Sequence, residues 1–141
     1  MSFVGRVFPE FRACLMGVLF CLSLGYPALA ADPYATGVGQ LDYRDSAPDA
    51  ATRQKALNLA KIDALERYVV HLRSIGRFSP LQYRLYLDAK PQLEASIDRY
   101  LRDIVILGEI VDKPKGIYRV EIRAAVDETR FQDATSLHKS P

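Results

Sequence analysis

The residues best suited to acid–base chemistry are one histidine and two carboxylates on a single expected helix. His71 is one of two histidines in this 141-residue chain, and Asp63 and Glu66 precede it on that helix. Neighbours on a helical surface are three or four residues apart, so the two carboxylates cannot both lie beside His71. The members of a catalytic constellation are therefore not gathered, and the sequence predicts that the protein is not an enzyme.

Metal ligands are equally sparse. Both cysteines, Cys14 and Cys21, fall in the first thirty residues, and the second histidine, His138, is far from His71. A zinc site of nitrogen and sulfur ligands is hard to build from such a set. Three aspartates between positions 42 and 49 lack the glycine and the terminal glutamate of a calcium loop. We expect no bound metal.

A glycine pair near residue 38 is the one feature that resembles a phosphate-binding loop. Gly37 and Gly39 are separated by a single residue, but the third glycine of a dinucleotide fingerprint is missing and no helix follows at once. Glycines in a strand also permit close approach of another backbone. We therefore interpret the pair as structural and expect no cofactor.

Tyrosines interleaved with arginines form the candidate partner-binding site. The set is Tyr83, Arg84, Tyr86, Arg99, Tyr100 and Arg102. Both residue types are enriched at interface hot spots. The alternative is an amphipathic helix pair whose tyrosines cover the core and whose arginines pair with nearby aspartates. Stacking on nucleic acid is disfavoured, because 19 basic and 17 acidic residues give a net charge of only +2. The set predicts a surface for a protein partner or for self-association.

The elements that position these residues begin with a strand over 34–43 and a long helix over 48–74. Ser46, Pro48 and Asp49 supply a capping serine, an early proline and an acid in the first turn. Apolar residues recur along the helix at spacings that trace one broad face, and three alanines allow it to lie close to a sheet. Lys61 falls inside this face, and its long stem is expected to carry the charge to the edge.

A second helix is expected from Ser79, which is followed by a first-turn proline and by Gln82 at the reciprocal capping position. The helix extends to about Lys90, where Pro91 must kink it or begin another. Apolar residues keep the helical spacing as far as Ile104, so the pattern predicts a helical pair over 80–103.

Two strands follow. Residues 104–111 are rich in β-branched side chains and are typical of a buried strand. Every second residue from Tyr118 to Val126 is apolar, and the residues between them are Arg119, Glu121, Arg123 and Ala125, which is the period of a strand with one face in a core. The turn between the two strands predicts an antiparallel hairpin. Near its turn, the hairpin edge carries Lys113, Pro114 and Lys115, residue types that discourage pairing with another strand. The sequence thus predicts an α+β fold: a small, mainly antiparallel sheet in β-α-α-β-β order with helices packed on one face.

The first thirty residues are typical of a cleavable export signal. Arg6 and Arg12 precede an apolar stretch without charges, and Ala28-Leu29-Ala30 fits the small-residue rule for cleavage. Neither cysteine suits lipid attachment, so we expect a mature protein without a lipid anchor. We also expect no stable membrane span after cleavage. We predict a signal peptide over 1–30, one domain over 31–132, a flexible tail over 133–141, and a periplasmic or secreted location.

The order of these features resembles the amino-terminal module of the flagellar assembly protein T family and related small envelope lipoproteins. An Ala-x-Gly-x-Gly strand is followed by an alanine-rich helix that contains Arg53-Gln54-Lys55-Ala56-Leu57 with Ala60, Asp63 and Ala64. Gly108-Glu109 then lies on a strand, and Tyr118-x-Val120-x-Ile122 leads into Val126-Asp127-Glu128. The resemblance covers roughly residues 35 to 128. It implies an envelope location, an assembly role and no catalytic residue.

Two function classes follow from these observations. The first is an exported, non-enzymatic interaction or assembly module of the cell envelope. The second is a secreted inhibitor or ligand-binding domain, because a helix on an antiparallel sheet also suits protease inhibitors. The segment around Gly37 and Gly39 separates them, since a mobile wedge there favours inhibition and a paired strand favours a structural role.

Overall fold

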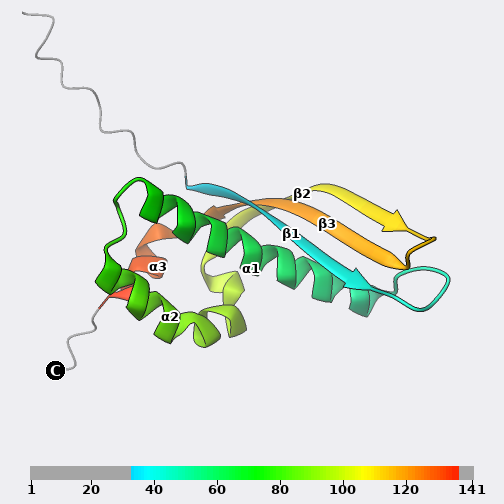
Figure 1. Cartoon of the computed structure of the whole chain (residues 1–141), viewed down its shortest axis with the longest axis horizontal. Coiled ribbons are helices and arrows are strands. Elements are labelled where there is room, and N and C mark those ends of the chain that lie inside the picture. The colour runs from blue at the N-terminus through cyan, green and yellow to red at the C-terminus, as the bar shows by residue number, and fades with distance from the viewer. Residues whose placement is uncertain (1–32, 137–141) are drawn as a thin grey trace, which may run out of the picture. The chain divides into compact units, whose positions relative to one another are not determined.

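The computed structural model describes residues 33–136, which belong to one compact unit. Its elements in chain order are β1 (Tyr34–Asp42), α1 (Ala50–Ser74), α2 (Pro80–Ala95), a short 3-10 helix η1 (Ile97–Arg99), β2 (Leu101–Asp112), β3 (Ile117–Val126) and α3 (Glu128–Thr135). Figure 1 shows α1 running along the sheet, with α2 and α3 gathered toward its carboxyl end. The expected signal peptide and His138 lie outside the described residues.

The three strands form an antiparallel sheet in the order β1-β3-β2, with helices packed on it, so the predicted α+β fold is confirmed. The hairpin of β2 and β3 is present, and its turn lies at residues 113–116 as predicted. Alternate residues of β3 are buried, including Tyr118, Val120 and Ile122. They face α1, which packs chiefly on β1 and β3. The strict alternation in the sequence arises because only one face of β3 is covered.

α1 lies so close to β1 that only glycine fits at Gly37 and Gly39. A Cβ built on Gly39 would lie 1.8 Å from the carbonyl oxygen of Ala56, and one on Gly37 would lie 2.0 Å from that of Ala60. Both glycines pair with β3 in the sheet. The glycine pair therefore serves packing between a strand and a helix, and it does not project as a wedge.

Capping side chains define the starts of both long helices. Ser79 and Gln82 form the predicted reciprocal capping box, with Ser79 Oγ accepting from the Gln82 amide at 3.2 Å. The first helix begins two residues later than predicted. Asp49 is the N-cap, and its carboxylate accepts from the Thr52 amide at 2.7 Å. Aspartate and serine are both favoured N-cap residues, so Ser46 and Asp49 were competing candidates for the start of this helix.

The helical pair predicted as far as residue 103 is wrong beyond Ala95. α2 continues through Pro91 to Ala95, η1 follows, and Leu101 already begins β2. Leu93, Ile97 and Leu101 keep a helical spacing and are all buried, yet they belong to three different elements. The burial pattern alone could not distinguish these elements from one helix.

A third helix, α3, was not predicted. Asp127 caps it by accepting from the Arg130 amide at 3.2 Å, and Phe131 is 1% exposed. Phe131 completes an aromatic cluster with Tyr68 of α1, Phe78 of the α1–α2 loop and Tyr86 of α2. Because α3 extends to Thr135, residues 133–135 are helical and are not part of a flexible tail. None of the helices within 33–136 combines the length and the apolar character that crossing a membrane requires.

Candidate functional site

Tyr86, one of the predicted partner-binding residues, belongs to the core. Its side chain is 4% exposed, and its ring lies 6.5 Å from that of Phe78 and 6.1 Å from that of Phe131. Burial raises the pKa of Tyr86 to about 12, as expected for a hydroxyl withdrawn from water. A surface role for Tyr86 is therefore wrong, because the ring joins α2 to α3.

Tyr83 lies at the border of the same cluster. Its ring stacks on that of Tyr86 at 6.1 Å, and the Arg73 guanidinium of α1 lies 3.9 Å from its centroid. Tyr83 and Tyr86 line a hollow of about 260 Å³ between α1 and α2. Arg84 is exposed on the following position of α2. The face of the Tyr83 ring can bind a cation, and the Arg73 guanidinium of the same chain already lies over it.

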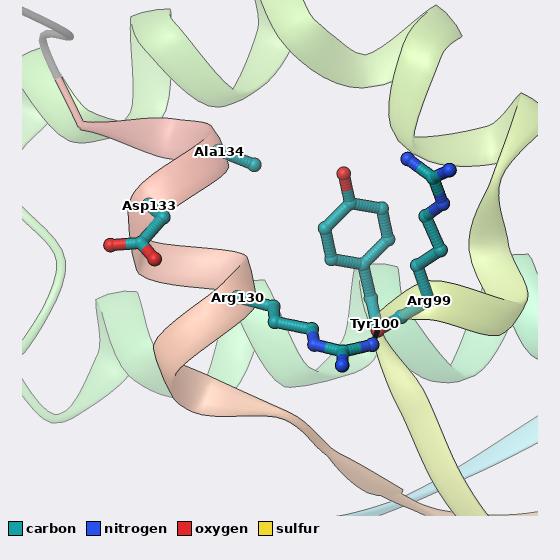
Figure 2. Close-up of a pocket in the computed structure, with 5 residues that line it drawn as sticks. All are labelled: Arg99, Tyr100, Arg130, Asp133 and Ala134. Carbon is teal, nitrogen blue, oxygen red and sulfur yellow. Dashed lines mark hydrogen bonds between the residues drawn. The ribbon is translucent and has the colours of Figure 1, made fainter.

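Arg99 and Tyr100 lie at a separate place, where η1 meets α3. They line a hollow of about 550 Å³ together with Arg130, Asp133 and Ala134. Figure 2 shows the Tyr100 ring between the side chains of Arg99 and Arg130. Arg130 donates to the Arg99 carbonyl oxygen at 3.4 Å, which ties α3 to η1. Sequence reasoning missed the α3 residues because α3 itself was not predicted.

Arg102, the sixth predicted residue, lies on β2 and forms a 3.6 Å ion pair with Asp127. Its side chain remains 65% exposed. The six predicted residues therefore divide among a core cluster, the hollow at α3 and the start of β2. The helical spacing that united them in the sequence is broken by η1, so they do not form one surface.

The imagined acid–base group on α1 is dispersed as well. His71 is exposed, whereas Asp63 accepts from the Val38 amide and from Arg67, each at 2.8 Å. Glu66 pairs with Lys90 at 2.5 Å, and this hydrogen bond raises the pKa of Lys90. Both carboxylates thus make structural contacts. Within residues 33–136, no three potential ligands are close enough to hold a metal ion.

The feature least expected from the sequence is the exposure of β2. The prediction of a buried strand is wrong, since five large apolar side chains on it are 39–59% exposed. These residues are Val105, Ile106, Leu107, Ile110 and Val111. α1 packs chiefly on β1 and β3, and β2 extends past the cover that α1 provides. Figure 1 shows β2 at one edge of the sheet, on the far side of β3 from β1.

The register with β3 assigns the exposed side chains of β2 to both faces of the sheet. Ile106 pairs with Ile122 and Val111 with Tyr118, which places them on the side of α1. Val105 and Ile110 pair with Arg123 and Arg119, on the opposite side, which faces solvent. β2 is thus apolar on both faces, which explains why its sequence resembles that of a buried strand.

The two edges of the sheet differ in protection. On β1, the Val38 amide is bonded to the Asp63 carboxylate of α1, so a helix side chain occupies that edge. β2 has β3 on one side, and no strand pairs with its other side in the part of the chain that the structure describes. Lys113, Pro114 and Lys115, which were expected to discourage pairing at this edge, lie in the turn beyond the end of the strand. The backbone of β2 is therefore available for pairing.

A small hollow of about 240 Å³ adjoins β2 on its α1 side. Arg53 and Leu57 of α1 line it together with Ile106 and Glu109 of β2. The Tyr118 hydroxyl donates to Glu109 at 2.5 Å, and burial reinforced by this bond raises the pKa of Tyr118 to about 12. The one charged side chain in the middle of β2 thus has a partner within the chain.

Comparison of the sequence with protein-family models and with curated proteins finds no match.

Proposed function

We propose that this protein is an exported, non-enzymatic interaction or assembly module of the cell envelope, and that it binds protein through β2. The observation that carries the proposal is the exposure of five large apolar side chains on an edge strand that, within residues 33–136, pairs with a neighbouring strand on one side only. Large apolar patches on the surface of a protein are typical of interaction sites. Natural edge strands are ordinarily short or charged, or another element covers them. β2 has 12 residues and an apolar centre, and α1 packs chiefly elsewhere.

Two further observations support the envelope location. The amino-terminal pattern of Arg6 and Arg12, an uncharged apolar stretch and Ala28-Leu29-Ala30 is that of an export signal. The order of elements also resembles the amino-terminal module of the flagellar assembly protein T family, which implies an assembly role in the envelope. The resemblance includes Gly108-Glu109, and these two residues lie in the middle of β2.

A ligand-binding domain is the second candidate, and the hollow at α3 favours it. Two guanidinium groups, Arg99 and Arg130, flank Tyr100 there, and such groups suit a carboxylate. The carboxylate of Asp133 lines the same hollow and offsets part of this positive charge. The inhibitor alternative loses its distinguishing feature, because Gly37 and Gly39 are paired within the sheet.

In-cell photo-crosslinking tests the proposal. A photoreactive amino acid replaces Ile110, which is 59% exposed on β2, in the full chain expressed in a Gram-negative host. The matched control replaces Leu59, which is 41% exposed on α1. We expect adducts in the periplasmic fraction from position 110 and none from position 59. Equal labelling at both positions, or no adduct from position 110, would contradict a binding role for β2.

A further inference from the structure

We infer that the free edge of β2 pairs antiparallel with β2 of a second copy of this chain, which joins two three-stranded sheets into one of six strands. This inference deepens the proposed function and rests on β2 being the interaction surface. The partner is identified by three properties of β2: its open backbone, the side chains on its two faces, and the charges at its two ends.

The open backbone restricts pairing to this edge of the sheet. On β1, the Asp63 carboxylate occupies the Val38 amide, and α1 lies against the strand at Gly37 and Gly39. A strand that paired with the outer edge of β1 would have to displace the Asp63 carboxylate from the Val38 amide. Within residues 33–136 no strand pairs with the outer side of β2, so an added strand can bond to the backbone there without displacing a neighbouring strand.

A bulge in β2 makes its two halves complementary. Strict alternation would place Val105 and Ile110, five residues apart, on opposite faces of the sheet. The register with β3 shifts between Ile106 and Gly108, and Leu107 is the additional residue. Val105 and Ile110 therefore lie on the same face, the one that faces solvent.

This arrangement specifies one register for a symmetric pair. With the two-fold axis at the bulge, Val105 of each copy lies opposite Ile110 of the other on the solvent face. On the side of α1, Ile106 lies opposite the aliphatic stem of Glu109, whose carboxylate is held by Tyr118. Apolar side chains thus meet apolar groups on both faces, and cross-strand pairs of this kind stabilise a sheet.

The charges at the ends of β2 favour the antiparallel direction. Arg102 lies near the start of the strand, is 65% exposed and pairs with Asp127, and Asp112, its last residue, pairs with Lys115 at 3.6 Å. Both lie opposite β3 residues that point away from α1, Ala125 and Ile117. A second register shift, after Arg102, allows Arg102 to lie opposite Asp112 of the second copy in the register described above. A parallel pair would instead place like charges together at each end, which is destabilising.

Sedimentation equilibrium of the purified full chain, processed as the host processes it, tests the inference first. We expect a reversible dimer whose dissociation constant rises at least about a hundredfold in Ile110→Lys, because the lysine lies at the centre of the apolar contact. Val70→Lys is the matched control: Val70 is 63% exposed on α1, and the variant should dimerise like the parent. Melting temperatures measured at low concentration verify that both variants fold.

Charge reversal tests the register. Arg102→Asp places two aspartates opposite each other at both ends of the dimer, and Asp112→Arg places two arginines there. Each variant alone should dimerise on the order of tenfold more weakly than the parent, because two exposed ion pairs become repulsive. An equimolar mixture restores opposite charges at both ends and should dimerise like the parent. Since any folding defect persists in the mixture, recovery there reports the contact itself.

Three results would overturn the inference: a chain that stays monomeric up to about 1 mM, a dimer that Ile110→Lys leaves intact, or a mixture no tighter than its components. The mass of the adduct from position 110 separates this outcome from failure of the proposed function. An adduct of twice the chain mass supports self-pairing. An adduct of another mass, with a monomeric purified chain, retains β2 as a binding surface and refutes the second copy as its occupant.

Discussion

Replacing Gly39 by alanine tests the packing that places α1 on β1 and leaves β2 uncovered. The added Cβ would lie 1.8 Å from the Ala56 carbonyl oxygen and 2.7 Å from the Ala60 amide nitrogen. Both atoms belong to the helix backbone, so no side-chain rotation relieves the clash and the helix must move from the strand. Overpacking of this kind costs about 3 kcal/mol of unfolding free energy, less roughly 0.5–1 kcal/mol that alanine gains by restricting the unfolded chain.

Gly108→Ala is the matched control, because a Cβ at Gly108 has no atom within 4 Å. Thermal unfolding followed by circular dichroism measures the difference. Each 1 kcal/mol shifts the melting temperature of a domain of this size by about 4–8 °C, so Gly39→Ala should melt roughly 8–20 °C below the parent. Low protein concentration keeps association at β2 from affecting the comparison. Melting temperatures within about 3 °C for the two variants would show that α1 does not rest on the β1 backbone as described.

Three further outcomes follow from the core and its charged groups. Val120→Asp places an unpaired charge at a site that is 1% exposed and should lower the unfolding free energy by several kcal/mol in urea titrations; an unchanged midpoint would mean that β3 presents its other face to α1. Lys61 is 9% exposed and bonds to Asp98 at 2.6 Å. Lys61→Met should change stability by less than about 1 kcal/mol, whereas Asp98→Asn leaves a buried ammonium without an opposite charge and should cost about 1–3 kcal/mol; the reverse ranking would refute this interpretation of the pair. Burial and the bond to Glu109 raise the pKa of Tyr118 from 10.0 to about 12 in the folded protein. As pH rises, the Tyr118 hydroxyl therefore ionises in the unfolded chain before it ionises in the folded one. Stability should therefore be full below about pH 10 and fall between about pH 10 and 12, and Tyr118→Phe should show a smaller fall over that window; an equal fall would remove Tyr118 as a contributor.

Much of the fold could be predicted from the sequence because the local signals have specific physical causes. The capping box at Ser79 and Gln82 satisfies backbone amides that the helix itself leaves unpaired, and the alternation from Tyr118 to Val126 indicates a strand with one covered face. The α3 helix was harder to recognise, since its eight residues contain one large buried side chain, Phe131. Its detectable signal was an aspartate cap, Asp127, followed by a short helical stretch.

The candidate site was less predictable, because side-chain type does not reveal which surface the fold leaves uncovered. Tyr86 has the residue type of an interface hot spot, yet it packs between Phe78 and Phe131. Ile110 has the residue type of a core strand, yet it is 59% exposed. Both errors arise from tertiary packing: α3 closes over one, and α1 stops short of the other.

Hydrogen exchange along β2 tests most directly the claim that this strand is where the protein associates. Amide exchange of a peptide spanning Leu101–Asp112 is measured by mass spectrometry at low and high concentration of the full chain. The peptide spanning Tyr34–Asp42 is the internal reference, since α1 protects that edge. We predict that the outward amides of β2, which do not pair with β3, exchange rapidly in the dilute chain and slow as concentration rises, while the inward β2 amides and β1 remain unchanged. Outward β2 amides that exchange slowly when dilute, or at the same rate at every concentration and after addition of envelope extract, would contradict association through this strand.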